Sequence, residues 1–391
     1  MSDLEITGVD VHLLEGPRPW LIVRVETDAG VTGVGEVPRW APGRRVETAD
    51  VRRLGERLVG ADPFDTECLF GAGGRLGAGP NDLFTTTIAG GLDVACWDLK
   101  GTHLGVPVHQ LLGGKRRERV RAYANGWDFD ARAVVDRYHE GEEPDAVLAD
   151  TIEEITAAAD RVVDAGYTAL KFSPFQWGDG PTTSRLELDS ALAVVEAVHE
   201  TVPEEVELLI EGHQHLATGD AVRAARRLEA VDPGFYEEPV PAEVGPLREV
   251  ARKSSVPIAT GESFATHRGF AELIADTDVS VVQPDVVAAG GITELDKIAA
   301  MASAERVGFA PHNAAGPVMT AAAVQVDAAT PAFAIQETFE DFFHPDWSRD
   351  LLADPLRIED GYIEIPDRPG IGVELDKSVL RAHEITGEAG A

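Results

Sequence analysis

Cysteine is nearly absent from this sequence, and long apolar runs are missing altogether. The only cysteines are Cys68 and Cys96, which excludes a disulfide framework and a cysteine metal site. No stretch approaches the ~20 apolar residues that a membrane-spanning helix requires. The first residues, MSDLEITGVDVHLLEG, lack the basic segment and apolar run of a signal peptide. We therefore expect a soluble protein of the cytoplasm.

Positive charge is also scarce, and lysine most of all. The chain has 34 Lys and Arg residues against 68 Asp and Glu residues, and its formal net charge at pH 7 is −34. A surface this acidic repels DNA, RNA and anionic membranes, so we expect no nucleic-acid or membrane partner. Because the acids are spread along the whole chain, they favour a hydrated, halophilic surface over a binding site for basic partners.

The N-terminal part has the pattern of a small α+β domain. Alternating apolar residues predict strands at 3–14, 20–27 and 31–37, the last two joined by a turn. Apolar residues at steps of three and four predict helices at 46–58 and 86–104. A length of 391 residues, 44% of them hydrophobic, leaves room for a large barrel beside this domain.

From residue 120 onward, strand and helix patterns alternate. Strands are predicted at 120–124 and 168–172, and helices at 148–166 and 190–199. Polar residues then close short apolar runs at gaps of 23 to 27 residues, about the length of one βα unit; they are Glu211, Glu237, Glu262, Asp285, His312 and Glu337. This repeat predicts a parallel α/β barrel, in which the strand ends meet at the face that carries the active site.

Three consecutive strand ends carry glutamates, Glu211, Glu237 and Glu262. Hard cations such as Mg²⁺ prefer carboxylate oxygens and leave positions open for water or substrate. The lack of cysteine beside them argues against zinc. Each glutamate alone could be an ordinary loop acid, but three in register on consecutive units predict a Mg²⁺ site.

A lysine and two histidines would complete this face. Lys171 ends an earlier strand and could neutralise a substrate carboxylate, although a solvated loop lysine is the alternative. Asp285 and His312 end adjacent strands, so the carboxylate could accept a hydrogen bond from the imidazole and raise its basicity. His213 lies two residues after Glu211, and on an extended strand both side chains would point the same way. A structural hydrogen bond is the alternative for either histidine.

Eight short motifs follow one another from the N-terminal hairpin to the C-terminal tail. They are VRVETDAGVTGVGE, IAGGLDVACWDLKG, HQLLGG, YEEPV, GES, QPDVVAAGGITE, APHNAAGP and PGIGVELD. Their order and spacing resemble the mandelate racemase branch of the enolase superfamily, and most closely its sugar-acid dehydratases of the D-galactonate dehydratase type. The resemblance covers nearly the whole chain.

For the fold, this resemblance implies a modified (β/α)7β TIM-like barrel at residues 120–338. Residues 1–119 would form an α+β capping domain, to which the C-terminal segment, residues 339–391, returns. Relatives of this type assemble into dimers or octamers, so we expect a homo-oligomer.

For the site, the resemblance implies Mg²⁺ at the three glutamates and roles for five other residues. Asp285 and His312 match the dyad in which the histidine removes the proton α to the carboxylate. His213 matches the general acid for the departing hydroxyl. Lys171 and Glu337 match positions that contact the substrate carboxylate or the enediolate. The reaction implied is dehydration of a C5 or C6 aldonic acid, such as D-galactonate, D-gluconate or D-xylonate, to a 2-keto-3-deoxy acid.

Two positions depart from the family's pattern. Glu211 stands where Asp is usual, and Ser173 replaces the second lysine of the racemases' Lys-x-Lys pair. Because serine cannot act as a second base, a two-base racemase is disfavoured. An epimerase of a related sugar acid and a non-catalytic scaffolding member are the alternatives, and the complete set of acids, dyad and lysine argues against the scaffold.

The hydroxyl groups of the substrate would be read by loops around the site. The candidate segments are 38–45, 125–130 and 342–347, and the first contains Trp40 and Arg45. Substrate contact and plain packing or solvation are equally open for these two residues.

Overall fold

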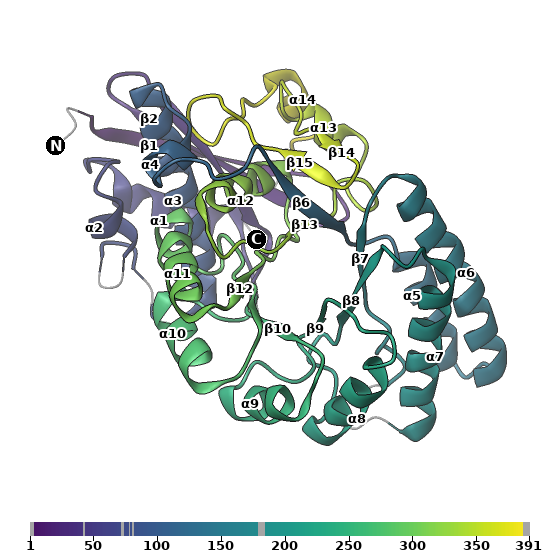
Figure 1. Ribbon diagram of the computed structural model, residues 1–391. Helices are drawn as coiled ribbons and strands as arrows, with labels where there is room; N and C mark the ends of the chain where they lie inside the picture. Colours follow the sequence, from purple (N-terminus) through teal and green to yellow (C-terminus); the bar gives the residue numbers. More distant parts are fainter. Residues whose placement is uncertain are drawn as a thin grey trace.

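The computed structural model describes residues 4–41, 44–71, 74–77, 79, 82–178 and 184–385 and shows a barrel joined to a second domain (Figure 1). The second domain is built mainly from the N-terminal part of the chain, coloured purple and blue, and we call it the capping domain. The barrel elements follow in teal and green. Among the described helices, none combines the length and the hydropathy needed to cross a membrane.

The capping domain is an antiparallel sheet with a long helix on one face. In the described residues its strands pair in chain order, as β1 (Ile6–Leu14), β2 (Trp20–Thr27) and β3 (Thr32–Pro38). Helix α3 (Leu83–Leu104) packs against β2 and β3. The approach is close, because a Cβ atom on Gly33 would lie 2.1 Å from the carbonyl oxygen of Ala95. Only glycine lets the helix come this near to the strand.

Shorter elements surround this sheet. They are β4 (Trp40–Ala41), β5 (Arg44–Arg45), α1 (Thr48–Gly55), the 3₁₀ helix η1 (Glu56–Leu58), α2 (Thr66–Phe70) and α4 (Val108–Leu111). Side chains of β2 and α3 form the core of the domain, among them Leu21, Val23, Val25, Ile88, Leu92 and Leu99. The domain therefore has an apolar interior of its own.

The barrel consists of eight parallel strands within the described residues. They are β6 (Arg119–Ala124), β7 (Ala169–Phe172), β8 (Glu207–Glu211), β9 (Phe235–Glu237), β10 (Ile258–Thr260), β11 (Val281–Val282), β12 (Gly308–Phe309) and β13 (Gln336–Thr338). Neighbours pair in order from β6 to β12, and β13 pairs in parallel with β6. Phe309 exchanges backbone hydrogen bonds with Ala332 and Ala334, which closes the ring.

Helices connect the strands on the outside of the barrel (Figure 1). Those described are α5 (Phe129–His139), α6 (Pro144–Asp164), α7 (Arg185–Thr201), α8 (Thr218–Leu228), α9 (Val244–Lys253), α10 (Thr266–Asp276), α11 (Ile292–Glu305) and α12 (Pro317–Ala329). Both α5 and α6 lie between β6 and β7, and each later pair of strands has one helix. Side chains such as Tyr123, Leu209 and Phe235 fill the interior, so the barrel is packed. The fold is a modified (β/α)7β barrel with an α+β capping domain.

The C-terminal segment runs along both units. It contains α13 (Trp347–Asp350), β14 (Ile358–Glu359), β15 (Tyr362–Glu364) and α14 (Lys377–Ala382). β15 pairs in antiparallel fashion with β6, and Ile385 N donates to Leu13 O at 2.8 Å on the edge of the capping sheet. The division of the chain into units 1–119, 120–338 and 339–391 stays a prediction.

Most predicted elements are confirmed to within a few residues of their ends. The strand at 20–27 has the predicted bounds, while the helix predicted at 148–166 is α6, which begins and ends earlier. The helix predicted at 46–58 is α1 followed by the 3₁₀ turn η1. Helix α5 was not predicted, although Ala131, Val135 and Tyr138 have the i, i+4, i+7 spacing of a helix face that packs on the core.

Candidate active site

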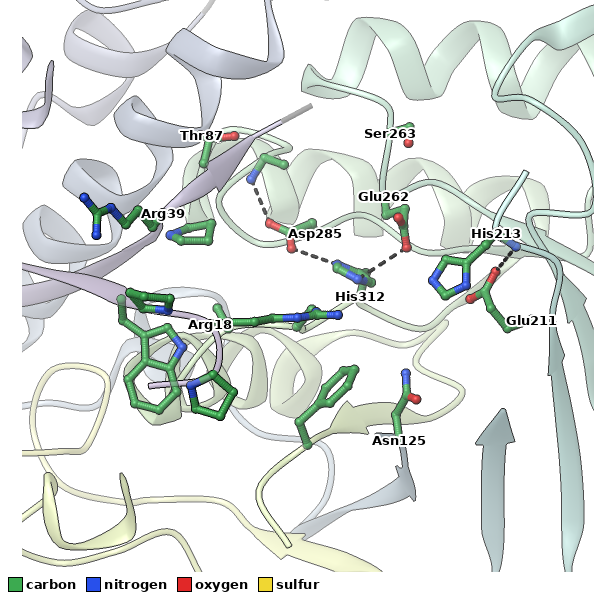
Figure 2. Close-up of a pocket in the computed structure, with 18 of the residues that line it drawn as sticks. Arg18, Arg39, Thr87, Asn125, Glu211, His213, Glu262, Ser263, Asp285 and His312 are labelled. Carbon is green, nitrogen blue, oxygen red and sulfur yellow. Dashed lines mark hydrogen bonds and ion pairs between the residues drawn. The ribbon is translucent and has the colours of Figure 1, made fainter. Parts of the chain in front are cut away.

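A cavity of about 590 Å³ opens where the carboxyl ends of the barrel strands face the capping domain (Figure 2). Six of the eight predicted site residues line it, namely Lys171, Glu211, His213, Glu262, Asp285 and His312. The other two, Glu237 and Glu337, are buried at 1% and 0% exposure and lie beneath the cavity. The barrel therefore brings the predicted residues to one end, as parallel strand register requires.

The three predicted metal ligands form a compact cluster. Glu211 and Glu237 are direct partners in the register between β8 and β9, and Glu262 follows two residues after β10. One carboxylate oxygen from each glutamate lies within 4.8 Å of the others. Burial and the charge of Glu211 together raise the pKa of Glu237 to about 8. Carboxylate oxygens held this close repel one another, and a hard divalent cation relieves that repulsion.

Lys171 lies among these acids and links them. It is 2% exposed, and its Nζ lies 2.6 Å from Oε1 of Glu237, 2.8 Å from Oε1 of Glu337 and 3.3 Å from Oε2 of Glu211. Burial alone would lower the pKa of Lys171, but the charges of Glu237 and Glu337 outweigh burial and raise it well above the usual value. The ammonium group therefore stays charged, which excludes the solvated loop lysine.

Glu337 is held on both carboxylate oxygens. Besides the contact with Lys171, Oε1 accepts from Nδ2 of Asn125 at 2.6 Å and Oε2 accepts from the backbone N–H of Asn313 at 2.8 Å. Burial would raise the pKa of Glu337, but the charges of Lys171 and His312 outweigh it and lower the pKa to about 2. Glu337 is thus a fixed anion behind the cavity wall.

Asp285 and His312 form the predicted pair. Nδ1 of His312 lies 2.8 Å from Oδ2 of Asp285, and Nε2 lies 3.3 Å from Oε2 of Glu262 (Figure 2). Burial would lower the pKa of His312, but the charges of Glu262 and Glu337 outweigh it and raise the pKa to about 10. The ring therefore has a carboxylate at one nitrogen and presents the other to the acidic cluster.

His213 reaches the cavity, but not in the predicted way. β8 ends at Glu211, and His213 has φ of 45°, so the backbone has left the extended conformation. The expectation that Glu211 and His213 point the same way on one extended strand was therefore wrong. His213 is placed instead by a hydrogen bond from its backbone N–H to Oε1 of Glu211 at 2.7 Å and by Oγ of Ser173, 2.9 Å from its Nδ1. Burial lowers the pKa of His213 to about 4.

Ser173 connects His213 to a partly buried ion pair. Its backbone N–H donates to Oδ2 of Asp128 at 3.0 Å, and Asp128 accepts two hydrogen bonds from the guanidinium of Arg132, at 2.8 and 2.9 Å. Arg132 also lines the cavity. The position where the racemases have their second lysine is thus occupied by a hydroxyl that contacts a predicted site histidine.

The capping domain contributes residues that the sequence did not single out. Arg18 extends into the cavity toward His312 (Figure 2), and its guanidinium carbon lies 5.3 and 5.5 Å from the ring centres of Phe343 and Phe339. Burial lowers the pKa of Arg18. Thr87 of α3 also lines the cavity. In the sequence, Arg18 stands between Pro17 and Pro19 in the link from β1 to β2. Such a pattern is common in loops and did not single Arg18 out.

Two of the three candidate recognition segments reach the cavity. Segment 38–45 contributes Pro38, Arg39 and Arg45, and segment 125–130 contributes Asn125 and Phe129. The side chain of Trp40 lies outside the described part of the structure. Segment 342–347 contributes none of the described lining residues, and the nearby Phe339 lines the cavity instead. The third segment was therefore predicted a few residues too late.

The sequence matches two family descriptions, one on each side of the domain boundary. Residues 15–113 match the N-terminal domain of the mandelate racemase / muconate lactonizing enzyme family, and residues 154–379 match the family described as enolase C-terminal domain-like. Together the matches span most of the chain. The chain belongs to the mandelate racemase / muconate lactonizing enzyme family of the enolase superfamily.

Curated relatives that match nearly the whole chain are named for sugar acids. A D-gluconate dehydratase of Thermoproteus tenax is 35% identical over 97% of this chain and 73% of its own length. A D-xylonate dehydratase of Haloferax volcanii is 33% identical over 99% of this chain and 91% of its own length. A D-galactonate dehydratase of Xanthomonas euvesicatoria is 34% identical over 93% of this chain and 91% of its own length.

Solved structures agree with the family assignment. A mandelate racemase/muconate lactonizing enzyme from Jannaschia sp. superposes with a TM-score of 0.83 at 31% identity, covering 98% of both chains. An enolase-superfamily member from Salmonella Typhimurium gives a TM-score of 0.81 at 28% identity, covering 97% of this chain and 98% of its own. The chain is therefore an enolase-superfamily enzyme of the lyase class, to which its dehydratase relatives belong.

Proposed function

We propose that the protein is a Mg²⁺-dependent dehydratase of a C5 or C6 aldonic acid, such as D-galactonate, D-gluconate or D-xylonate. The observation that carries the proposal is the placing of an acidic cluster, a carboxylate-paired histidine and a second histidine around one cavity. Three relatives that match more than 90% of this chain bear the names of these three dehydratases. The small-molecule substrate would enter between barrel and capping domain.

In this proposal the three glutamates hold the cation. Glu211, Glu237 and Glu262 offer only carboxylate oxygens, the donor set that Mg²⁺ prefers. The bound cation would supply positive charge for the enediolate that forms when a carboxylate loses its α proton. Glu211 reaches one methylene further than the usual Asp, and it fits the cluster by ending β8 directly beside Glu237.

His312 is proposed as the base. A cation held by Glu262 would offset the carboxylate charge that raises the pKa of His312, so that Nε2 is free to take the proton from C2 while Asp285 holds Nδ1–H and stabilises the imidazolium. Lys171 would neutralise charge on the substrate carboxylate. Glu337 would act on the same carboxylate or on the enediolate through Lys171, because it is buried behind that ammonium group.

His213 is proposed as the acid. It lies on the Glu211 side of the cavity, whereas His312 lies on the Asp285 side (Figure 2). The negative charge of a bound substrate would raise the pKa of His213 from about 4, so that as the bond from C3 to its hydroxyl breaks, a protonated His213 donates the proton with which that hydroxyl leaves as water. The enol that remains takes up a proton at C3 and becomes a 2-keto-3-deoxy acid.

The residues above the reaction centre would read the sugar chain. Arg18 presents a guanidinium to the cavity from the capping domain, and Asn125 lines the cavity directly after the end of β6 (Figure 2). Both groups can donate hydrogen bonds to hydroxyl oxygens. We also propose a homo-oligomeric enzyme of the cytoplasm with a surface adapted to high salt, on the strength of the family resemblance and the net charge of −34.

An epimerase acting on a related acid is the second candidate. The observation that favours it is the pair of histidines at separate positions on the cavity wall, since two bases could exchange a proton on opposite faces of C2. An epimerase would return an acid of changed configuration without loss of water. The same experiment separates the two reactions.

The test is turnover of a panel of aldonic acids by the purified protein with Mg²⁺ at high salt, followed by proton NMR. A 2-keto-3-deoxy product from one or two acids is expected, and it would name the substrate. Exchange of the C2 proton in D₂O with a changed configuration and no water loss would favour the epimerase. No product and no exchange with any acid would overturn the proposal and favour the scaffolding alternative.

A further inference from the structure

Two barrel helices begin at glycines that cannot cap them. Helix α11 has Gly291 at its N-cap and helix α12 has Gly316, and neither residue has a side chain to accept from the first turn. The first N–H groups of a helix need acceptors from elsewhere. In both helices the acceptor is a buried carboxylate of the capping domain.

Glu36 of β3 supplies the acceptor for α12. It is 0% exposed, and its two oxygens accept from the backbone N–H groups of Gly316 and of Met319, the latter at 3.1 Å. A Cβ atom on Gly316 would lie 2.9 Å from Oε1 of Glu36, so the glycine admits the carboxylate. His312 lies only four residues before Gly316, in the link between β12 and α12.

Asp93 of α3 supplies the acceptor for α11. It is also 0% exposed, and it accepts from Thr293 twice, from the backbone N–H at 2.9 Å and from Oγ1 at 2.6 Å. Gly291 has φ of 84°, and a Cβ atom there would lie 2.3 Å from Oδ2 of Asp93. Asp285 lies in the preceding loop, where Val287 N–H and Ala288 N–H hold it.

The two carboxylates therefore fasten the two loops that carry the Asp285–His312 pair. The packing agrees, because α11 contacts α3 and α12 contacts β3. A negative charge at a helix N-terminus is favourable, since the helix dipole and the unpaired N–H groups both attract it. Burial raises the pKa of Glu36 and of Asp93 to about 7 each, opposed by these hydrogen bonds.

We infer that Glu36 and Asp93 are positioning residues through which the capping domain sets the geometry of the Asp285–His312 pair. The inference rests on the proposed function in so far as that pair removes the proton. Neither carboxylate lines the cavity, so each acts through the loop that it holds. A capping domain that only covered the site would not need buried anions at these two helix ends.

The test compares Glu36→Gln and Asp93→Asn with Asp98→Asn. Asp98 is a matched control because it is also a buried carboxylate of α3, and it accepts hydrogen bonds of 2.8 Å from the backbone N–H groups of Val34 and Ile371, outside both loops. Each substitution removes one buried charge at nearly constant volume. Melting temperatures are measured first, and activities are compared well below the lowest of them.

For Glu36→Gln and Asp93→Asn we expect kcat to fall by about 10- to 100-fold, because small misplacements of reacting groups cost this much. KM should stay within about threefold, and the isotope effect of C2-deuterated substrate on kcat should rise as proton removal becomes slower. Asp98→Asn should lose stability but keep the kcat and isotope effect of the wild type. Equal losses in all three variants, or unchanged kcat in the first two, would overturn the inference.

Amide hydrogen exchange gives a readout that does not depend on activity. Peptides covering residues 285–293 should exchange faster in Asp93→Asn, and those covering 312–320 should exchange faster in Glu36→Gln. Asp98→Asn should leave exchange in both regions as in the wild type. Unchanged exchange in all three variants would show that Glu36 and Asp93 do not hold these loops. A wild type that turns over no acid would instead refute the proposed function, while the exchange experiment would still decide whether the carboxylates hold the loops. If one variant does not fold, the other carries the test by itself.

Discussion

Nδ1 of His312 lies 2.8 Å from Oδ2 of Asp285, although 27 residues separate them in the sequence. The other oxygen of Asp285 accepts from the backbone N–H groups of Val287 and Ala288, at 3.0 and 2.8 Å. The carboxylate is thus fixed by its own loop and in turn fixes the imidazole. This leaves Nε2 of His312 as the nitrogen that faces the acidic cluster.

Replacing His312 by Asn should abolish exchange of the substrate's C2 proton. Positioned acid–base groups contribute about 10²- to 10⁴-fold to rate, so dehydration should fall by at least that much. The measurement is loss of the C2 proton signal in D₂O, followed by NMR. Stabilisation by Mg²⁺ should persist and serves as the control for folding. Exchange that continues at the wild-type rate would show that another group is the base.

Replacing His213 by Asn should separate the two halves of the reaction. Dehydration should fall by about 10²- to 10⁴-fold, while C2 proton exchange continues, because only the departing hydroxyl loses its proton donor. Ser173→Ala should show the same separation to a smaller degree, since it removes the hydroxyl 2.9 Å from Nδ1 of His213. Product formation and exchange are measured in one D₂O sample. If both fall together in His213→Asn, the histidine is not the acid.

Lys171→Met should destabilise the metal-free protein by about 3–5 kcal/mol, because it leaves buried carboxylates without their cation. Mg²⁺ should recover part of this loss by binding the same acids. The matched control is Lys253→Met, which removes an exposed ion pair with Glu249 that should contribute about 0–1 kcal/mol. Urea unfolding with EDTA and with Mg²⁺ gives the free energies. If the two substitutions lower the free energy of unfolding equally, Lys171 does not stabilise the buried carboxylates as proposed.

The pH dependence of stability should differ between the wild type and Asp98→Asn. Burial raises the pKa of Asp98 from 3.8 to about 7 in the folded protein. The folded state therefore holds this proton more tightly than the unfolded state, so ionisation destabilises it. Relative to Asp98→Asn, the wild type should lose up to about 4 kcal/mol as pH rises from about 4 to about 7, and no more above that. A difference that stays constant, or that grows in favour of the wild type, would contradict the raised pKa.

Salt should stabilise this protein. The net charge of −34 repels itself across the folded surface, and raising KCl from about 0.1 M to about 1 M shortens the screening length from about 10 Å to about 3 Å. We expect the melting temperature to rise by several degrees. The control is the same titration near pH 4.6, the isoelectric point, where the effect should shrink. A melting temperature that falls with KCl at pH 7 would show that surface ion pairs outweigh the repulsion.

The sequence was a good guide to the strand ends and a poor guide to the links beyond them. Glu211, Glu237 and Glu262 were predicted to converge because parallel strands with similar lengths of connecting chain place their ends at one face. The pairing of Asp285 with His312 followed from the same rule and is confirmed as a contact. The conformation of His213 was mispredicted, since the alternation rule holds only while the backbone remains extended.

By itself, therefore, the sequence determined most of the elements and the residues that stand at the strand ends, because both depend on local periodicity and spacing. Only the tertiary structure decided that Lys171 is buried among acids rather than solvated, and that Arg18 reaches the cavity. It also decided that Glu36 meets the helix that follows His312, some 280 residues further along the chain. Such contacts join surfaces of two domains, and no local pattern in either segment specifies the other.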